Sequence, residues 1–190
     1  MSGIDAYKCI LPGGREVLIR SGICADADRV FALVRASVLE EQVHDLNTLE
    51  DLPTREHERK WVEMLEQAPE KVLLLAESQG EVVGFVSFNN GHLKRLSHQG
   101  EISISVKQEW RDQGLGRQLF LALFAWAEKH PRIEKLSLQV VATNMRAIHL
   151  YQALGFVEEG RLRRQVKIAE GQYIDLVFMG KWLNRDVNYH

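Results

Sequence analysis

A short alternating segment, followed by a glycine-containing loop and an apolar helix, constrains the fold of this chain most. Residues 101–106 alternate between polar and apolar side chains, which predicts a half-buried strand. The loop 111–116 contains two glycines, and residues 117–130 are apolar on nearly every side. Such a helix is normally covered on more than one face. A strand that passes through a short loop into a buried helix is typical of an α/β domain.

The other segments predict further elements of both kinds. Helices are expected over residues 27–44, capped by Asp26, from Pro53-Thr54 to Pro69, and from Asn144 to about Leu154. The expected strands are 15–20, 71–76, 82–88, 134–142, 156–168 and 172–183. This order predicts an α/β domain with a mixed sheet, partly antiparallel and partly joined by a helical crossover. We expect residues 1–14 to form an N-terminal arm or first turn, 15–183 the domain, and 184–190 a C-terminal tail.

Composition excludes several functional classes. The 190 residues include 24 Lys and Arg and 26 Asp and Glu, so the formal charge is −2, which argues against a nucleic-acid partner. No apolar run approaches the ~20 residues that span a bilayer, so no membrane partner is expected. The first residues do not resemble a secretory leader, so we expect a cytoplasmic protein. Cys9 and Cys24 are then expected to be reduced, and a single disulfide between them is the alternative. The histidines show no metal-ligand spacing, so no metal is expected.

The glycine loop is the first candidate site. Gly114 and Gly116 let a ligand approach the backbone closely, and the N–H groups that begin the next helix form an anion site. Arg111 adds a guanidinium suited to phosphate. Taken alone, a Gly-x-Gly before a helix is more often a plain tight turn than a phosphate site.

The second candidate site follows the strand 134–142. Asn144 begins a helix and Tyr151 lies two turns later, so both face the same side and can line one cleft. The structural alternative is a capping Asn and a packed Tyr.

Together, the two features resemble the GNAT superfamily of acyl-CoA-dependent N-acetyltransferases. Arg111-x-x-Gly114-x-Gly116 matches its acetyl-CoA signature, and Asn144, Ala147, Tyr151 and Gly155-Phe156 match its second signature. The resemblance implies a mixed, mostly antiparallel sheet of six to seven strands, flanked by about four helices, with splayed central strands. It also implies acetyl-CoA as co-substrate. The implied cofactor-binding residues are Ile104, Ser105, Val106, Arg111, Asp112, Gln113, Gly114, Leu115, Gly116, Arg117, Asn144, Ala147 and Tyr151.

The resemblance also assigns catalytic roles. Tyr151 occupies the family's general-acid position, and Asn144 is expected to hydrogen-bond the pantetheine arm. Glu101 is the first candidate for the base, against the alternative of an exposed residue that only solvates the sheet. Asp175 and His98 are the further candidates. An acidic stretch is either a wall that attracts a cationic amine or a solvated helix face; its residues are Glu40, Glu41, Asp45, Glu50 and Asp51.

The implied activity is direct transfer of an acetyl group from acetyl-CoA to a primary amine. The tail of the chain looks like a bacterial subgroup, which favours a small-molecule amine acceptor such as an amino acid or a polyamine. A peptide or protein N-terminus, as in relatives that modify ribosomal proteins, is the enzyme alternative, and a CoA-binding module without turnover is the other. A closed pocket lined by the first two helices favours the small amine, whereas an open groove favours the peptide. Dimerisation is common in the family, so a homodimer is compatible with the resemblance.

Overall fold

The protein forms one eight-stranded sheet with helices on both faces. The computed structural model describes residues 3–40, 46–48, 50–91 and 93–183. The strand order is β1-β2-β3-β4-β5-β6-β8-β7. The strands are β1 (Tyr7–Ile10), β2 (Glu16–Ser21), β3 (Val72–Ser78), β4 (Glu81–Asn90), β5 (Gln99–Val106), β6 (Lys135–Val141), β7 (Val157–Ala169) and β8 (Gln172–Trp182). All neighbouring strands are antiparallel except β5 and β6, which confirms the expected mixed sheet.

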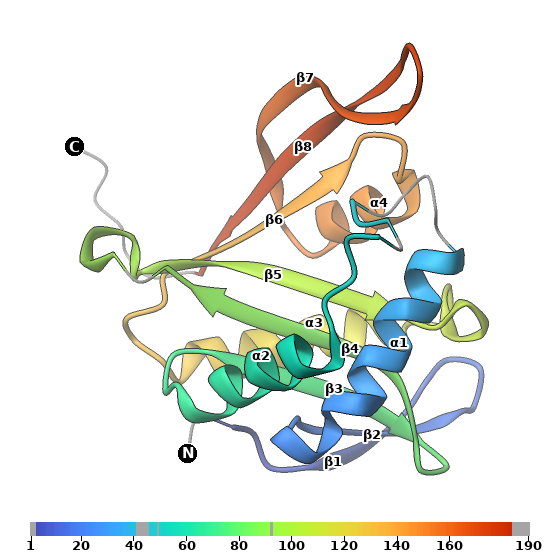
Figure 1. The fold of residues 1–190 in the computed structure, drawn as a ribbon. Helices are drawn as coiled ribbons and strands as arrows, with labels where there is room; N and C mark the ends of the chain where they lie inside the picture. The colour runs from blue at the N-terminus through green and yellow to red at the C-terminus, as the bar shows by residue number, and fades with distance from the viewer. Residues whose placement is uncertain (1–2, 41–45, 49, 92, 184–190) are drawn as a thin grey trace.

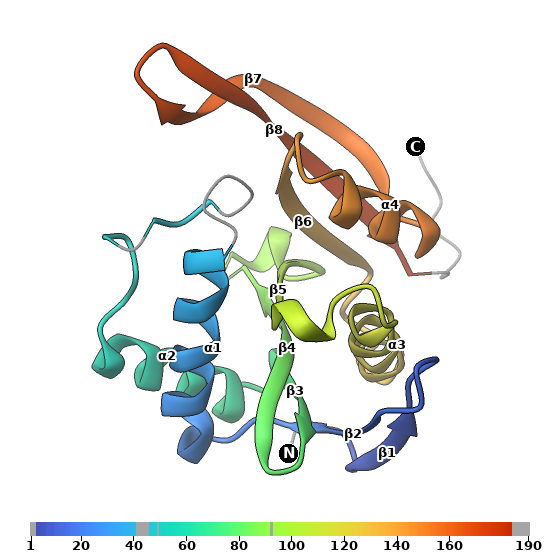
Figure 2. The same ribbon diagram turned by 90° about the vertical axis from the view of Figure 1, so that its right-hand side faces the viewer.

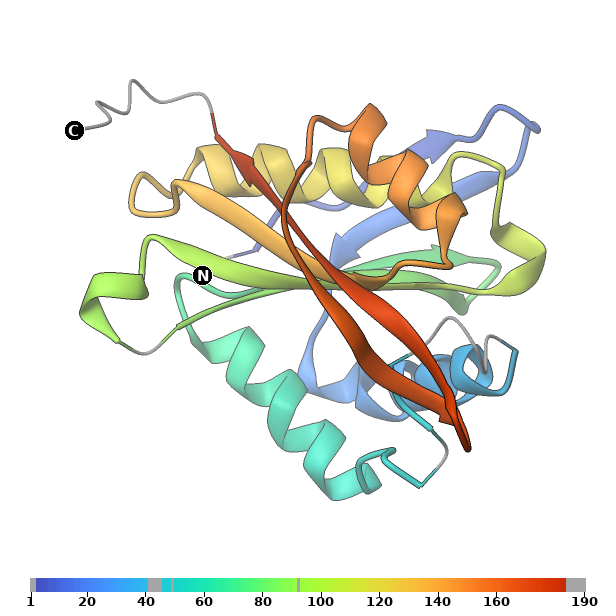
Figure 3. The ribbon, with the colours of Figure 1, turned by 90° about the horizontal axis from the view of Figure 1, so that it is seen from above.

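Two pairs of helices cover the sheet. The helices are α1 (Ala27–Glu40), α2 (Arg55–Gln67), α3 (Leu115–Glu128) and α4 (Met145–Ala153). α1 and α2 lie on one face, and α3 and α4 lie on the other (Figures 2 and 3). Each face has its own core: the smaller one packs α1 and α2 onto β3 and β4, and the larger one surrounds α3. None of the described helices is long and apolar enough to cross a bilayer.

The parallel neighbours β5 and β6 separate soon after they meet. They pair only from Gln99–Lys135 to Glu101–Ser137, and both strands then continue without pairing to each other. Figure 1 shows the resulting V, with β5 and β6 diverging toward the end at which α4 begins. The divergence, expected from the family resemblance, exposes an edge of β5 in the middle of the sheet.

Local sequence explains the elements around this opening. Gly114 precedes α3 with a φ of 85°, a left-handed conformation that glycine adopts without steric cost. Asn144 caps α4, because its side chain accepts a hydrogen bond from the N–H of Ala147 at 3.1 Å. Thr54 caps α2 in the same way through the N–H of His57. These caps fix where the two site-bearing helices begin.

The structure corrects some expectations at the N-terminus. Part of the expected arm, Tyr7–Ile10, forms the edge strand β1, because the turn around Pro12 brings it alongside the unpaired edge of β2. This strand raises the count to eight. Asp26 does not cap α1; its carboxylate accepts from the N–H of Ile23 and from Arg20. Both cysteines are free thiols.

Other boundaries differ by a few residues. The helix expected over 27–44 is described to Glu40, and residues 41–45 lie outside the described residues, as does the expected tail 184–190. α3 begins at Leu115 rather than Arg117, because Gly114 already turns the chain. β4 continues to Asn90, since this residue pairs with Gly100.

Candidate active site

Two cavities meet in the opening between β5 and β6. The smaller, about 210 Å³, lies between the glycine loop, β5 and α4. The larger, about 570 Å³, lies between β5, β6 and the helices α1 and α2. The residues that line both cavities are Ser37, Ile104, Ser105, Asn144 and Tyr151. A molecule in one cavity therefore touches the same wall as a molecule in the other.

The smaller cavity is built to hold an anion. Gly114, Gly116 and Arg117 line it at the beginning of α3. The first N–H groups of a helix have no acceptor within the helix, and the helix dipole places positive charge there. At Gly116 a Cβ atom would lie 3.1 Å from Leu150, so glycine also lets α3 and α4 pack closely. This geometry suits a diphosphate held by backbone groups.

The exposed edge of β5 offers a second set of backbone groups. Lys107 donates its N–H to the carbonyl of Val83, which fixes the hydrogen-bonding phase of the antiparallel β4–β5 pair. Ser103 and Ser105 therefore bond to β4, and the backbone groups of Ile104 and Val106 point toward β6. Because β6 has already diverged there, an extended ligand arm can pair with this edge.

Arg111 lines the smaller cavity, but its guanidinium also bonds to the protein and so stabilises the loop. Its Nε donates to the carbonyl of Val106 at 2.9 Å, and its terminal nitrogen donates to Glu40 at 3.1 Å. These bonds tie the loop to the end of β5 and to α1. The expected phosphate contact of this guanidinium thus competes with contacts inside the protein.

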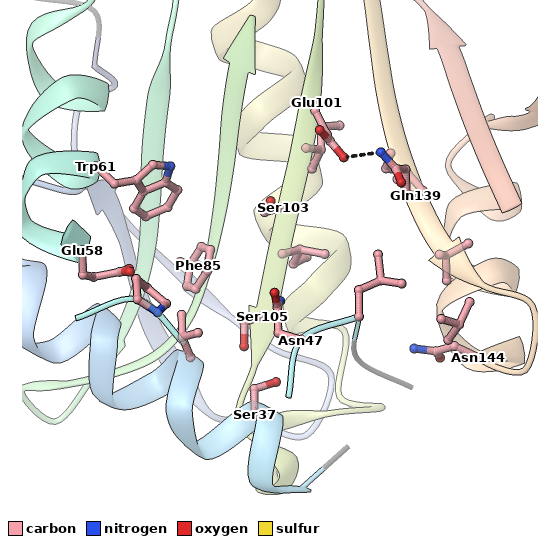
Figure 4. A pocket seen from close by; sticks show the side chains of 18 of the residues that line it. Ser37, Asn47, Glu58, Trp61, Phe85, Glu101, Ser103, Ser105, Gln139 and Asn144 are labelled. Carbon is pink, nitrogen blue, oxygen red and sulfur yellow. Dashed lines mark hydrogen bonds between the residues drawn. The ribbon is translucent and has the colours of Figure 1, made fainter. Parts of the chain in front are cut away.

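Asn144 and Tyr151 make the contacts of the structural alternative, and both residues also line the cavities. The Asn144 side chain caps α4 and also lines both cavities (Figure 4). The Tyr151 ring packs against Phe120 and Phe156, with centroid distances of 5.6 and 6.1 Å, yet the residue lines both cavities as well. Packing holds the phenol at the junction of the two cavities.

The junction also contains an unsatisfied polar atom. The hydroxyl of Ser105 is buried and has no hydrogen-bond partner in the described part of the protein. Buried polar groups are normally paired, so this hydroxyl is suited to a ligand that enters from either cavity. The residues present therefore fit the thioester end of acetyl-CoA.

Glu101 lies where β5 and β6 diverge. Its Oε1 accepts a hydrogen bond from Gln139 at 2.9 Å, which bridges the two strands (Figure 4). The residue is exposed and lines the larger cavity. Glu101 is therefore both a strand-bridging residue and an accessible carboxylate.

Glu58 is a site residue that the sequence interpretation missed. It lies on α2, is only 5% exposed, and lines the larger cavity. Burial raises the pKa of its carboxyl group. The signal was present in the sequence: Glu58 shares one helix face with the buried Val62 and Leu65, at spacings of about one and two turns.

Several predicted site residues lie outside the cavities. Gln113 bonds the carbonyl of Glu109, and Leu115 is buried in the core, so only its backbone faces the loop. Asp175 accepts the N–H of Arg164, and His98 stacks on Trp182. Neither Asp175 nor His98 lines the two cavities.

Two residues of the acidic stretch, Glu40 and Asp51, have partners in the described structure. Glu40 binds Arg111, and Asp51 caps the turn at Thr48. Glu41 and Asp45 lie outside the described residues. Among the described residues, no group of three or more His, Cys, Asp and Glu is placed to hold a metal ion.

The sequence matches a known protein family and several of its characterised relatives. Residues 40–156 match the model of the acetyltransferase (GNAT) family. The L-amino acid N-acetyltransferase AaaT of Escherichia coli is 26% identical over 87% of this chain and 98% of its own length. The spermidine N(1)-acetyltransferase of Vibrio cholerae is 28% identical over 61% of this chain and 68% of its own length.

Solved structures agree in fold. The GNAT-family acetyltransferase of Streptococcus pneumoniae has a TM-score of 0.80 and 31% identity, covering 88% of this chain and 99% of its own. The ribosomal-protein-alanine N-acetyltransferase of Brucella melitensis has a TM-score of 0.74 and 28% identity, covering 87% and 99%. A Salmonella typhimurium structure solved with its cofactor acetyl-CoA has a TM-score of 0.80 at 22% identity, covering 92% and 98%. Since the family model spans more than half of the chain, including the glycine loop and Tyr151, this protein belongs to the GNAT acetyltransferase family and uses acetyl-CoA.

Proposed function

We propose that this N-acetyltransferase moves the acetyl group directly to a primary amine of a small molecule. The observation that carries the proposal is the wall shared by the two cavities. It lets the donor thioester and the acceptor amine occupy adjoining spaces, so an acyl-enzyme is not needed. The larger cavity is lined by α1 and α2 residues such as Ser37 and Trp61, which favours a small amine.

In the proposed reaction the amine attacks the thioester carbonyl carbon. A C–N bond forms, the C–S bond breaks, and the amine loses a proton. The N–H of Val106 polarises the carbonyl oxygen, as a preorganised donor does. An aliphatic amine has a pKa near 10, so a base must accept a proton before or during attack, and Glu101 accepts it directly or through water.

Tyr151 donates a proton to the leaving thiolate in this proposal. A thiol has a pKa of about 8.5 and a phenol of about 10, so the transfer is feasible when the two groups are held together. Ser105 supplies a hydroxyl to the same region. Asn144 offers its side-chain amide to the pantetheine arm.

A peptide acceptor remains the second candidate. A third cavity, of about 580 Å³, shares Glu101, Leu138 and Gln139 with the cavity of about 570 Å³ described above. A longer acceptor would extend past the Glu101–Gln139 bond into this space.

Thiol release from acetyl-CoA, followed over a panel of amines and short peptides, tests the proposed function. We expect turnover with at least one small amine and slower turnover with peptides. A thermal-shift measurement supplies the binding control, because acetyl-CoA at about 1,000 times its Kd adds about 4 kcal/mol of stability. Stabilisation by acetyl-CoA without turnover of any amine would instead support a CoA-binding module.

A further inference from the structure

The buried carboxylates of this protein differ in their partners. In the described structure, Asp26 and Glu58 are the buried acidic residues, at 3% and 5% exposure. Asp26 accepts two hydrogen bonds from Arg20 and one from Arg29. The carboxylate of Glu58 makes no hydrogen bond or ion pair with any of the described residues.

An unpaired buried carboxylate reduces stability. Removing its water without supplying a partner costs free energy, whether the group ionises or takes up a proton. A Gln or Leu at this position of α2 would avoid much of that cost. Stability therefore does not explain Glu58, whereas a cationic ligand would.

Glu58 points from α2 into the larger cavity (Figure 4). The described lining contains the carboxylates of Glu58 and Glu101 but no Lys or Arg. In the sequence, residues 41–54, between α1 and α2, contain four acidic residues and no Lys or Arg. A carboxylate on the acceptor would find no counter-ion among these residues, whereas an ammonium group would find one at Glu58.

Aromatic residues stand beside Glu58. Trp61 follows one turn later on α2, and its ring meets Phe85 of β4 edge-on, with centroids 6.2 Å apart. Both residues line the cavity. This surface packs against a hydrocarbon chain, and an aromatic face also attracts a nearby cation.

We propose that Glu58 binds a second ammonium group of the acceptor, so that the cavity selects diamines or polyamines over amines that carry a carboxylate. The inference rests on the proposed function and specifies its substrate class. The attacking amine lies at the junction near Tyr151, the hydrocarbon chain lies along Trp61 and Phe85, and the distal ammonium reaches Glu58.

Three acceptors of equal chain length test this proposal: cadaverine, pentylamine and L-lysine. Cadaverine carries a second amine that pentylamine lacks, and L-lysine is cadaverine with an added carboxylate. We expect kcat/KM for cadaverine to exceed that for either of the others by about 10- to 100-fold, the range of a charge-assisted hydrogen bond. Equal rates with pentylamine, or a preference for L-lysine, would overturn the proposal.

Glu58→Gln is the informative variant. It should remove the preference for cadaverine over pentylamine, mainly through KM, and leave the Kd of acetyl-CoA unchanged. Glu58→Asp should restore part of the preference, because it keeps the charge. Glu63→Gln is the matched control, since Glu63 is exposed on the same helix and bonds Gln67. A cadaverine preference that survives in folded Glu58→Gln would contradict the role of Glu58.

The outcomes separate this inference from the proposed function. If acetyl-CoA binds but none of the three amines, nor any amine of the wider panel, is acetylated, the proposed function fails and the acceptor class fails with it. If amines are acetylated without the preference for a second ammonium, only the role of Glu58 fails.

Discussion

The two cavities that meet at Tyr151 are built in different ways. The smaller one lies between the glycine loop, the edge of β5 and α4, offers backbone groups of the loop and the strand edge, and depends in shape on glycines at two nearby positions. The larger one is formed by side chains from helices and strands that are far apart in the sequence. The first is suited to a constant ligand such as a diphosphate, while the second can change its specificity by substitution without altering the fold.

The largest expected effect lies at the junction of the two cavities. Tyr151→Phe keeps the ring that packs against Phe120 and Phe156 but removes the phenol hydroxyl. We expect kcat to fall by about 100- to 10,000-fold, the usual contribution of a general acid, with little change in acetyl-CoA affinity. Steady-state kinetics and calorimetric titration measure the two quantities. Unchanged kcat would remove Tyr151 from the acid role.

The second prediction concerns a carboxylate that already has its partners. Burial alone would raise the pKa of Asp26, but hydrogen bonds from Arg20 and Ile23, with the nearby charge of Arg29, lower it. Asp26→Asn should cost about 1.5–3 kcal/mol at neutral pH, because Arg20 and Arg29 lose their charge-assisted bonds to Asp26 and keep Glu77 as their carboxylate partner.

The pH dependence of this loss has a definite sign. Because the folded-state pKa of Asp26 is lowered, its stabilisation is present above the unfolded-state pKa and is lost as the pH falls through the folded-state value. The difference between wild type and Asp26→Asn should therefore shrink in acid. Asp28→Asn, at an exposed ion pair with Arg55, is the control and should cost about 0–1 kcal/mol. Denaturant unfolding measures both variants.

The third prediction tests the backbone character of the smaller cavity. Gly114→Ala forces a side chain into a left-handed conformation at the start of α3, at a cost of about 1–2 kcal/mol. If the loop relaxes to avoid this strain, acetyl-CoA should bind about 5- to 30-fold more weakly, with no change in amine preference. Gly80→Ala imposes the same kind of strain in the β3–β4 turn, at a φ of 80°, away from both cavities. Equal acetyl-CoA affinity in the two variants would contradict the role of the glycine loop in binding acetyl-CoA.

The smallest expected effect is a gain in stability at the larger cavity. Burial raises the pKa of Glu58, so the protein loses stability as the pH rises through the folded-state value of this group. Glu58→Gln should therefore melt at a higher temperature than wild type at about pH 8 and at a similar temperature at about pH 4. His57 and Glu101 line the same cavity, so the difference between the variant and the wild type, not the wild-type profile alone, is the measurement. A lower melting temperature at the higher pH would indicate an unrecognised partner of Glu58.

The sequence predicts the residues of the smaller cavity better than those of the larger one, for a physical reason. The glycine loop, the cap at Asn144 and Tyr151 lie in short contiguous motifs, and local geometry follows from local sequence. The eighth strand was missed because Tyr7–Ile10 gains its partner only through pairing with β2. Glu58 was missed because its spacing from Val62 and Leu65 places it on the inner face of α2 but does not reveal how deeply that face packs against the rest of the protein.

The proposed direct transfer requires simultaneous occupation of the two cavities that meet at Tyr151. Initial velocities over a grid of acetyl-CoA and amine concentrations test this claim most directly. Direct transfer in a ternary complex predicts reciprocal plots that intersect at a common point. Parallel plots, together with an acetylated protein isolated in the absence of amine, would indicate a covalent intermediate and contradict it.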